Sequence, residues 1–208
     1  MVSTTRLGRA ALTGYLLGTI PSADLAAKAA LGRSGDLRSE GTGNPGAANA
    51  AMVLGAKWGA AVMIADIAKG AAASAQGRRA AGDLGAHVGG VAAIAGHCWP
   101  VWNGFRGGKG VATSVGQCLM TFPVYLPIDL TVAVATAMSP RWKARAEAAT
   151  AAASATWVLS SAVWAWRKWP NLWGPAASPA LPAAALASSA MVLRRFASER
   201  EQAGRSSG

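Results

Sequence analysis

The sequence predicts an all-α protein, a polytopic integral membrane helix bundle with about seven transmembrane helices. Charged residues make up 14% of the 208 residues, whereas soluble globular proteins carry about 25%. The charge is also one-sided, because 20 Lys and Arg stand against 9 Asp and Glu and give a formal net charge of +11. Nine Trp residues add support, since Trp is enriched where an apolar segment meets water at a bilayer surface.

This composition excludes collagen, coiled coils, disulfide scaffolds and long disorder. A soluble nucleic-acid binder stays open as an alternative on net charge alone, although we expect no nucleic acid as a partner. The mean hydropathy of +0.26 is low for a multispanning protein, but Ala-rich helices score modestly and still insert if charges stay out. Cys98 and Cys118 lie in apolar runs without a ligand cluster, so we expect packing roles and no metal site.

The first expected helix covers residues 10–31, close to the roughly 20 residues that cross about 30 Å of hydrocarbon. A signal peptide would have a shorter apolar stretch, so we expect this helix to be retained. Further helices are expected at 58–75, 84–102, 108–121, 122–138, 148–166 and 176–193. One helix over 107–138 would be about 48 Å long, and Pro123, Pro127 and Asp129 favour a break inside it. The fourth helix is then about 21 Å long and short for a full span.

Loop charges favour a seven-span arrangement with the N-terminus outside and the C-terminus cytoplasmic. Twelve basic residues then lie inside: Arg33, Arg38, Lys57, Arg106, Lys109, Arg141, Lys143, Arg145, Arg194, Arg195, Arg200 and Arg205. Six lie outside: Arg6, Arg9, Arg78, Arg79, Arg167 and Lys168. This agrees with the positive-inside rule. Six spans with the N-terminus inside would also satisfy the rule and would put both glycine-rich loops outside, so that alternative stays open.

The first glycine-rich loop, residues 32–49, contains GTGNPGAAN. Gly41, Gly43 and Gly46 fit G-x-G-x-x-G, but the preceding segment is polar rather than a buried strand, which argues against a dinucleotide site. Successive glycine amides can instead cradle an anion. The neutral donors would be Thr42, Asn44 and Asn49, and Arg38 would add charge. A flexible polar loop is the alternative.

The second loop, residues 96–113, reads GHCWPVWNGFRGGKGVAT and is not a P-loop, because Gly110 follows Lys109 where Ser or Thr should hold magnesium. Gly107, Gly108 and Gly110 surround Lys109 at an expected helix N-terminus, where free amides and the helix dipole favour a phosphate. Arg106 can add a bidentate donor. A simple positive-inside anchor is the alternative, but it would not need three glycines.

Among the ionisable residues of the apolar helices, three are candidates for a role in the site. His97 could act as a general base, but a structural or phosphate-orienting role is the more common one. Asp66 and Lys69 share one helical face, so we expect an ion pair that faces the bundle interior and acts as a packing clamp. Without a nucleophile elbow or a Cys–His pair, chemistry here would rest on holding two phosphorylated molecules together. We therefore expect the two glycine-rich loops to lie close together on the same face of the membrane.

Four segments together resemble the bacterial acyl-phosphate-dependent glycerol-3-phosphate acyltransferases, the PlsY family. They are GYLLGTIPSADL (14–25), GTGNPGAAN (41–49), DIAKG (66–70) and the second loop. The resemblance covers roughly residues 10–120. It implies a seven-helix inner-membrane enzyme of phospholipid biosynthesis that transfers a fatty acyl group from acyl phosphate to the 1-hydroxyl of glycerol 3-phosphate. The product is lysophosphatidic acid, and neither a cofactor nor a covalent acyl-enzyme is implied.

Matched position by position, the resemblance implies two groups of site residues. The expected catalytic residues are His97, Lys109, Asn44 and Thr42, the last in place of a family Ser. The expected phosphate-binding residues are Arg38, Gly43, Gly46, Asn49, Arg106, Gly107, Gly108, Gly110 and Thr113. Substrates apart, the expected partner is the lipid bilayer, and we expect a monomer in the bacterial plasma membrane with its active site facing the cytoplasm.

Several positions depart from the family pattern. Ala48 replaces a Thr, and Met52 stands where the family has an Arg. The third family motif, a His, an Asn and an Arg near the C-terminus, is mostly missing. If Arg194, Arg195 and Phe196 align with its end, Ser189 takes the His position and Val192 takes the Asn position. The alternative is therefore a weak or inactive membrane paralogue that binds glycerol phosphate or phosphorylated lipid. We expect one domain over residues 1–198 and a disordered cytoplasmic tail over 199–208.

Overall fold

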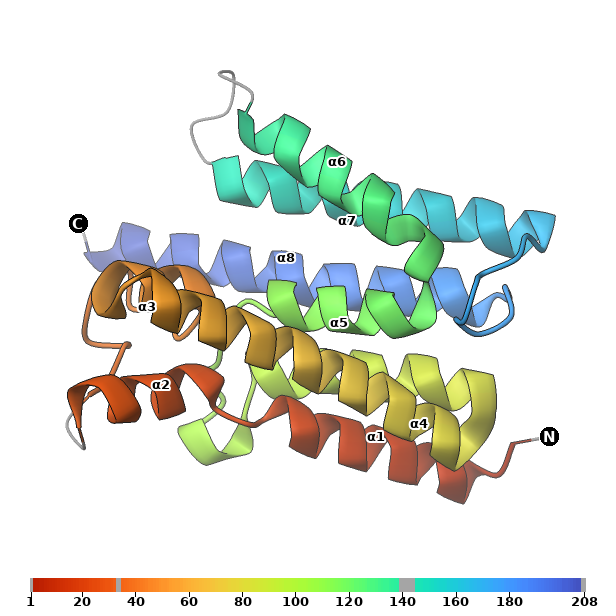
Figure 1. Ribbon diagram of the computed structural model, residues 1–208, viewed down its shortest axis with the longest axis horizontal. Helices are drawn as coiled ribbons and strands as arrows, with labels where there is room; N and C mark the ends of the chain where they lie inside the picture. The colour runs from red at the N-terminus through yellow and green to blue at the C-terminus, as the bar shows by residue number, and fades with distance from the viewer. Residues whose placement is uncertain (1, 33–34, 139–144, 207–208) are drawn as a thin grey trace.

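The computed structural model describes residues 2–32, 35–138 and 145–206, and all the regular elements in these ranges are helices. They run nearly parallel or antiparallel to one long axis (Figure 1). The α-helices are α1 (Thr4–Gly18), α2 (Ser22–Leu31), α3 (Ala47–Leu54), α4 (Ala56–Cys98), α5 (Val111–Thr121), α6 (Leu126–Met138), α7 (Arg145–Arg167) and α8 (Ala180–Ser206). Two 3-10 turns, η1 (Val101–Asn103) and η2 (Pro123–Tyr125), precede α5 and α6. The prediction of an all-helical fold is confirmed.

The first expected helix is broken into α1 and α2. Pro21 lies at the break and has no N–H to continue the helix, and it also disfavours a helical conformation at Ile20. The break leaves the Ile20 carbonyl free to accept hydrogen bonds from Ser22 N at 3.0 Å and from Lys69 Nζ at 3.0 Å. The expectation of one continuous helix over 10–31 is therefore wrong.

Helix α4 is a helical hairpin whose two arms correspond to the second and third expected helices. Ala81 and Gly82 leave the helical conformation, and Gly82 has φ of +65°, which favours glycine. The backbones of the arms touch, since a Cβ at Gly77 would overlap the carbonyl of Gly85. Helix α1 packs on the returning arm in the same way, where small residues allow close approach.

Helices α3 and α8 differ most from expectation. Helix α3 was not expected, and it begins at Gly46–Ala47 as the first loop ends. Helix α8 continues through Glu199 to Ser206, where the sequence analysis expects a disordered tail. The physical reason is docking of its last turns, because Phe196 is 9% exposed and Glu199 forms an ion pair with Lys109.

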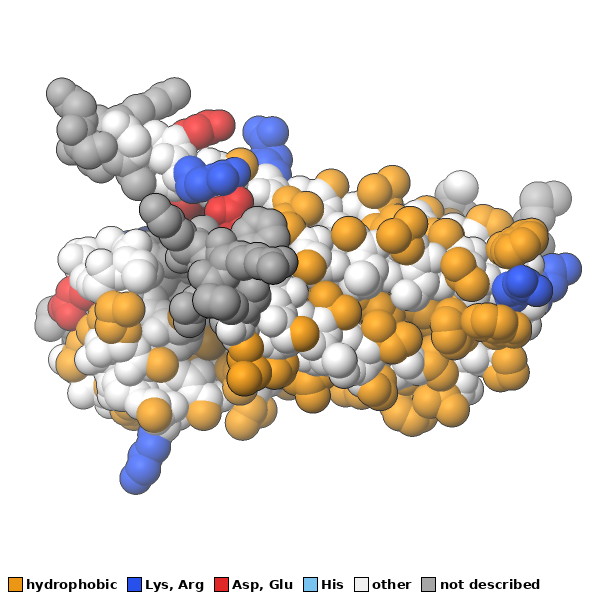
Figure 2. Space-filling model, turned by 90° about the horizontal axis from the view of Figure 1, so that it is seen from above, with side chains coloured by type: hydrophobic (Ala, Val, Ile, Leu, Met, Phe, Trp, Pro, Cys, Tyr) orange, Lys and Arg blue, Asp and Glu red, His pale blue; other side chains and the backbone are white. Residues whose placement is uncertain are grey.

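The N- and C-termini lie at opposite ends of the bundle (Figure 1). Within the described residues, length and hydropathy identify no individual helix as a membrane span, but α5 and the segment Pro123–Thr136 qualify together as a pair bent by 118°. Figure 2 shows hydrophobic side chains spread along much of one face, with Lys and Arg side chains nearer its ends.

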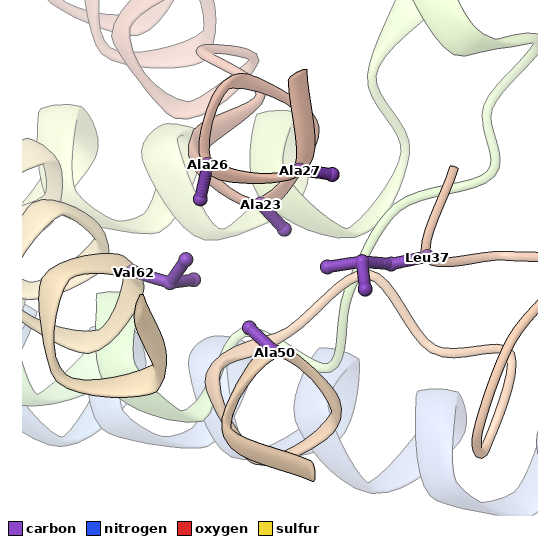
Figure 3. Packing of buried hydrophobic residues seen from close by; sticks show 6 residues of the cluster. All are labelled: Ala23, Ala26, Ala27, Leu37, Ala50 and Val62. Carbon is purple, nitrogen blue, oxygen red and sulfur yellow. The ribbon is translucent and has the colours of Figure 1, made fainter. Parts of the chain in front are cut away.

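A small core fixes the first glycine-rich loop against the helices. Ala23, Ala26 and Ala27 of α2 face Ala50 of α3 and Val62 of α4, and the loop inserts Leu37 among them (Figure 3). Leu37 is fully buried, and burying a Leu side chain contributes about 1.5–3 kcal/mol. This core sets where the polar part of the loop lies.

Candidate functional site

The two glycine-rich loops lie together at one end of the bundle. Arg38 Nη2 of the first loop is 3.4 Å from the carbonyl oxygen of Arg106 in the second. A Cβ at Gly108 would lie 3.3 Å from the carbonyl oxygen of Pro45. The expectation that the two loops meet is confirmed.

The second loop folds back on the end of α4. Gly107 N donates to the Cys98 carbonyl at 3.1 Å, and Gly108 N donates to the His97 carbonyl at 3.2 Å. A Cβ at Gly107 would overlap the His97 carbonyl, and one at Gly108 would overlap His97 Nε2, so only glycine fits at both positions. We expected these amides to face an anion, but here they are already donors to the chain.

The first loop is held by the amide of Asn49. Asn49 Oδ1 accepts from Thr42 N at 2.8 Å, and Asn49 Nδ2 donates to the carbonyls of Leu37 at 2.9 Å and Glu40 at 3.0 Å. Asn49 is 1% exposed. The structure therefore places it as a residue that shapes the loop rather than as the phosphate ligand that we expected.

One carboxylate joins the two loops. Glu199 of α8 accepts a hydrogen bond from Asn44 Nδ2 through Oε1, and its Oε2 lies 2.8 Å from Lys109 Nζ. The Lys109 ammonium also lies 4.7 Å from the centre of the Phe196 ring. Asn44 and Lys109, both expected catalytic residues, thus contact one negatively charged group. The sequence analysis missed Glu199 because it placed residues 199–208 in a disordered tail.

Arg195 was expected at the end of the reduced third motif and as an inner basic residue, but not as a site residue. Its guanidinium donates to the carbonyl of Gly107 at 2.6 Å and to the carbonyl of Gly108 at 3.2 Å. These bonds fasten the second loop to α8 and bring positive charge beside Lys109. Val192, at the expected Asn position, is 2% exposed and packs with Ile94 and Cys98.

Arg38 lines a small pocket between the two loops and the α1–α2 break. There its side chain is paired with carboxylates. It donates to Asp24 at 2.7 and 3.2 Å and to Asp36 at 3.4 Å. Partial burial alone would lower the pKa of Arg38, but the hydrogen bond and charge of Asp24, with Asp36, outweigh it and raise the pKa above its ordinary value. Arg38 therefore stays charged. Asp24, which also accepts from Asn103 Nδ2 at 3.0 Å, was missed although it stands out in an apolar run.

The same pocket collects His97, Asp66 and Lys69. Asp66 Oδ1 lies 2.9 Å from Lys69 Nζ, and each side chain is 5% exposed. The expected interior ion pair is therefore confirmed. His97 Nδ1 is 3.7 Å from the same carboxylate oxygen, so the pair lies in the candidate site.

The remaining expected site residues lie in the two loops or just after them. Thr42 and Gly43 form the exposed turn of the first loop, and the Thr42 hydroxyl accepts from Asn44 N at 3.4 Å. The Arg106 side chain is exposed. Gly46 and Gly110 are the residues before α3 and α5. Thr113 is fully buried in α5, and its backbone packs against Gly70 of α4, so it lies in a helix interface.

An apolar cavity of about 410 Å³ opens beside the second loop. Its walls come from α5, η2, α6, α7 and α8. Val111 and Val192 line it near the loop, whereas Tyr125 and Trp157 line it further along and belong to a buried cluster. The cavity thus lies within the helical bundle, next to the residues that follow the second loop.

Comparison with known proteins places this site in a family. The family model described as glycerol-3-phosphate acyltransferase matches residues 9–202. The chain belongs to the glycerol-3-phosphate acyltransferase family. A relative of that name from Allorhizobium ampelinum is 36% identical over 167 residues, covering 78% of this chain and 77% of the relative.

Other relatives match over a shorter length. The glycerol-3-phosphate acyltransferase of Thermoanaerobacter sp. (strain X514) is 42% identical over 130 residues, which cover 61% of this chain and 65% of the relative. That of Exiguobacterium sibiricum is 46% identical over 113 residues, 54% of each chain. The match thus spans less than two thirds of the length of these curated relatives.

Two solved structures resemble the whole fold. Both are crystal structures of PlsY, an integral membrane glycerol 3-phosphate acyltransferase. The glycerol 3-phosphate form has a TM-score of 0.75 and 27% identity, and the lysophosphatidic acid form has 0.76 and 26%. Each alignment covers 96% of this chain and 90% of the other.

Proposed function

We propose that this chain transfers a fatty acyl group from acyl phosphate to the 1-hydroxyl of sn-glycerol 3-phosphate and forms lysophosphatidic acid. Family membership supports this, as do the two similar PlsY structures, whose forms contain glycerol 3-phosphate and lysophosphatidic acid. The observation that carries the proposal is the contact of Glu199 with both Asn44 and Lys109. A carboxylate held by one donor from each loop marks a joint anion site.

In this proposal a substrate phosphate replaces the Glu199 carboxylate. Lys109 and Asn44 then contact the phosphate oxygens, and Arg195 keeps the loop of Lys109 in position through the Gly107 and Gly108 carbonyls. A phosphate that leaves from acyl phosphate gains negative charge, and fixed positive donors stabilise such charge in the transition state. Thr42 and Arg106, exposed at the same end, are the further groups that a second phosphate can contact.

The proposed chemistry is a direct displacement. The substrate hydroxyl oxygen forms a bond to the acyl carbon, the bond from that carbon to the phosphate oxygen breaks, and phosphate leaves with the electron pair. The hydroxyl proton goes to His97 or to a substrate phosphate. Because acyl phosphate is already activated, a strong protein base is not required.

The apolar cavity supports an acyl-chain site in this proposal. It lies next to the loop of Lys109, and apolar walls favour a hydrocarbon chain over water. With the phosphate at Lys109, the chain would enter past Val111 and Val192 and extend toward Tyr125 and Trp157.

We further propose seven membrane-embedded segments, with the site facing the cytoplasm. The segments are α1 with α2, the two arms of α4, and α5 to α8. The termini at opposite ends of the bundle fit an odd number of crossings. Apolar side chains are exposed along the bundle, among them Leu12, Leu16, Ile64, Leu130, Leu159 and Leu186.

We propose that one copy of the chain is sufficient for activity, because both loops and the cavity come from it.

A weak or inactive paralogue is the second candidate. It is favoured by Ser189 and Val192, which supply no imidazole or amide near the site. Purified protein supplied with palmitoyl phosphate and labelled glycerol 3-phosphate distinguishes the two. We expect labelled lysophosphatidic acid, and at least a hundredfold less from Lys109→Ala. Binding of glycerol 3-phosphate without product at high enzyme concentration would select the paralogue.

A further inference from the structure

The end of the bundle opposite the glycine-rich loops is strongly basic. The N-terminal turns of α1, the turn of the α4 hairpin and the α7–α8 connection lie there together (Figure 1). Gly14 and Gly18 of α1 pack on Gly89 and Ala93 of α4, which brings the start of α1 close to the hairpin turn. We call this region the basic end, and its Lys and Arg residues are Arg6, Arg9, Arg78, Arg79, Arg167 and Lys168.

One carboxylate pairs with one of these cations. Asp83 lies 3.1 Å from Arg78 Nη2 and accepts a hydrogen bond from Ala176 N at 3.0 Å. Arg78 Nη1 donates to the Trp173 carbonyl at 2.7 Å, so this pair ties the hairpin turn to the α7–α8 connection. The other five cations are exposed and form no ion pair with any carboxylate that the structure describes.

Large apolar side chains are exposed among these cations. Trp166 is 76% exposed, Leu172 65% and Trp173 56%. The Arg167 guanidinium lies 4.7 Å from the centre of the Trp166 ring. The indole N–H of Trp173 donates to the Leu119 carbonyl at 2.9 Å, so this ring is fixed by its polar edge. Figure 2 shows Lys and Arg side chains beside hydrophobic ones at this end.

The fold fixes the backbone of the α7–α8 connection. Lys168 and Leu172 have φ of +53° and +48°, in the left-handed region that residues other than glycine rarely adopt. Asn171 Nδ2 donates to the carbonyls of Thr121 at 2.9 Å and Pro175 at 2.8 Å. Strained conformations persist only where the surrounding structure imposes them. The contacts of this connection therefore hold an exposed cation and an exposed apolar side chain in place.

A phospholipid with an anionic headgroup matches this surface. Its phosphate pairs with Arg and Lys, and its apolar part contacts the Trp and Leu side chains, which a small soluble anion would leave unused. Each basic residue near an anionic bilayer surface contributes roughly fivefold in affinity, and Trp is enriched at the same level of the bilayer. Apolar side chains continue from this end along α1 and α7, where Leu12, Leu159 and Val163 are exposed.

We propose that the basic end, with Trp166, Leu172 and Trp173, binds anionic phospholipids of the membrane leaflet away from the acyl-transfer site. The headgroup phosphate contacts the unpaired cations, and the acyl chains lie along the exposed faces of α1 and α7. A zwitterionic headgroup carries its own cation and gains less from this surface. The inference needs the membrane-embedded bundle proposed above, but it is independent of acyl transfer.

Lipid preference is tested by native mass spectrometry of the full chain purified in detergent. Phosphatidylglycerol and phosphatidylcholine with the same acyl chains are titrated, and we expect wild type to bind phosphatidylglycerol at least about tenfold more tightly. Arg79→Gln combined with Lys168→Gln should reduce this preference at least about fivefold. The matched control is Lys28→Gln combined with Lys57→Gln, which removes equal charge from exposed residues of α2 and α4 and should leave the preference within about twofold. Equal binding of the two lipids by wild type, or equal losses in the two double variants, would overturn the proposal.

Hydrogen–deuterium exchange of wild type locates the bound lipid without any substitution. We expect phosphatidylglycerol to slow amide exchange in residues 166–176 and in the hairpin turn at 78–83, and phosphatidylcholine to slow it less. Protection confined to the glycine-rich loops would overturn the proposal. Inorganic phosphate that protected residues 166–176 as well as phosphatidylglycerol would show a site for free anions, and would overturn the assignment to a lipid.

Discussion

Glu199 should compete with the substrate phosphate that binds between Asn44 and Lys109. The carboxylate must leave both partners before a phosphate can contact them, and removing its charge should therefore strengthen binding. Glu199→Gln keeps the size of the side chain and removes the charge. Glu201→Gln is the control, because Glu201 is exposed two residues further along the same helix and its replacement changes the net charge equally.

The size of the effect follows from the exposure of the pair. The Lys109 and Glu199 side chains are 29% and 30% exposed, so their ion pair is worth at most about 1 kcal/mol. The hydrogen bond from Asn44 to the carboxylate adds roughly 1 kcal/mol. Gln keeps an oxygen that can accept from Asn44, so Glu199→Gln removes only part of the second contribution. The resulting loss of about 1–1.4 kcal/mol corresponds to a five- to tenfold change in affinity.

Steady-state kinetics of lysophosphatidic acid formation measure this effect. We expect Glu199→Gln to lower KM for one of the two phosphorylated substrates about five- to tenfold. The substrate whose KM falls is the one whose phosphate binds between Asn44 and Lys109. Glu201→Gln should leave both KM values within twofold of wild type. A higher KM or a large loss of kcat in Glu199→Gln would mean that Glu199 orients Lys109 for catalysis, and would refute the competition.

Three other predictions follow from the site and the cavity. Lys57→Ala should keep wild-type turnover, in contrast to Lys109→Ala, because Lys57 is exposed in the first turn of α4. Equal losses in both variants would show that only general positive charge matters. Asn49→Ala removes three hydrogen bonds and should lower the free energy of unfolding by about 2–3 kcal/mol, measured by thermal denaturation in detergent. Unchanged stability together with weaker substrate binding would mean that Asn49 is a phosphate ligand. Trp157→Ala should extend the preferred acyl phosphate by several carbons, measured by competition between chain lengths, and an unchanged preference would place the chain elsewhere.

The sequence analysis predicted the helical fold and the meeting of the two glycine-rich loops. Hydrophobic runs report helices well because burial of an apolar face is encoded locally. The sequence analysis did not predict correctly which groups the hydrogen-bond donors inside the loops would contact. Asn49 and the Gly107 amide have the same hydrogen-bonding capacity toward a phosphate and toward their own backbone, and a local pattern does not distinguish these partners.

The remaining differences depend on contacts between distant segments. Glu199 reaches Lys109 only because α8 continues past residue 198 and docks through Phe196 and Arg195. Asp66 and Lys69 were expected as a packing clamp because their spacing shows the ion pair but not its neighbour. His97 becomes that neighbour only when the hairpin at Ala81–Gly82 folds the two arms of α4 together.

The most direct test of a joint anion site is titration of the detergent-solubilised protein with inorganic phosphate by calorimetry. Wild type is compared with Asn44→Ala in the first loop and Lys109→Ala in the second. If one anion contacts both loops, each substitution alone weakens phosphate binding, the loss being larger for Lys109→Ala because a charge is removed. Phosphate binding that is weakened in only one of the two variants would contradict a shared site.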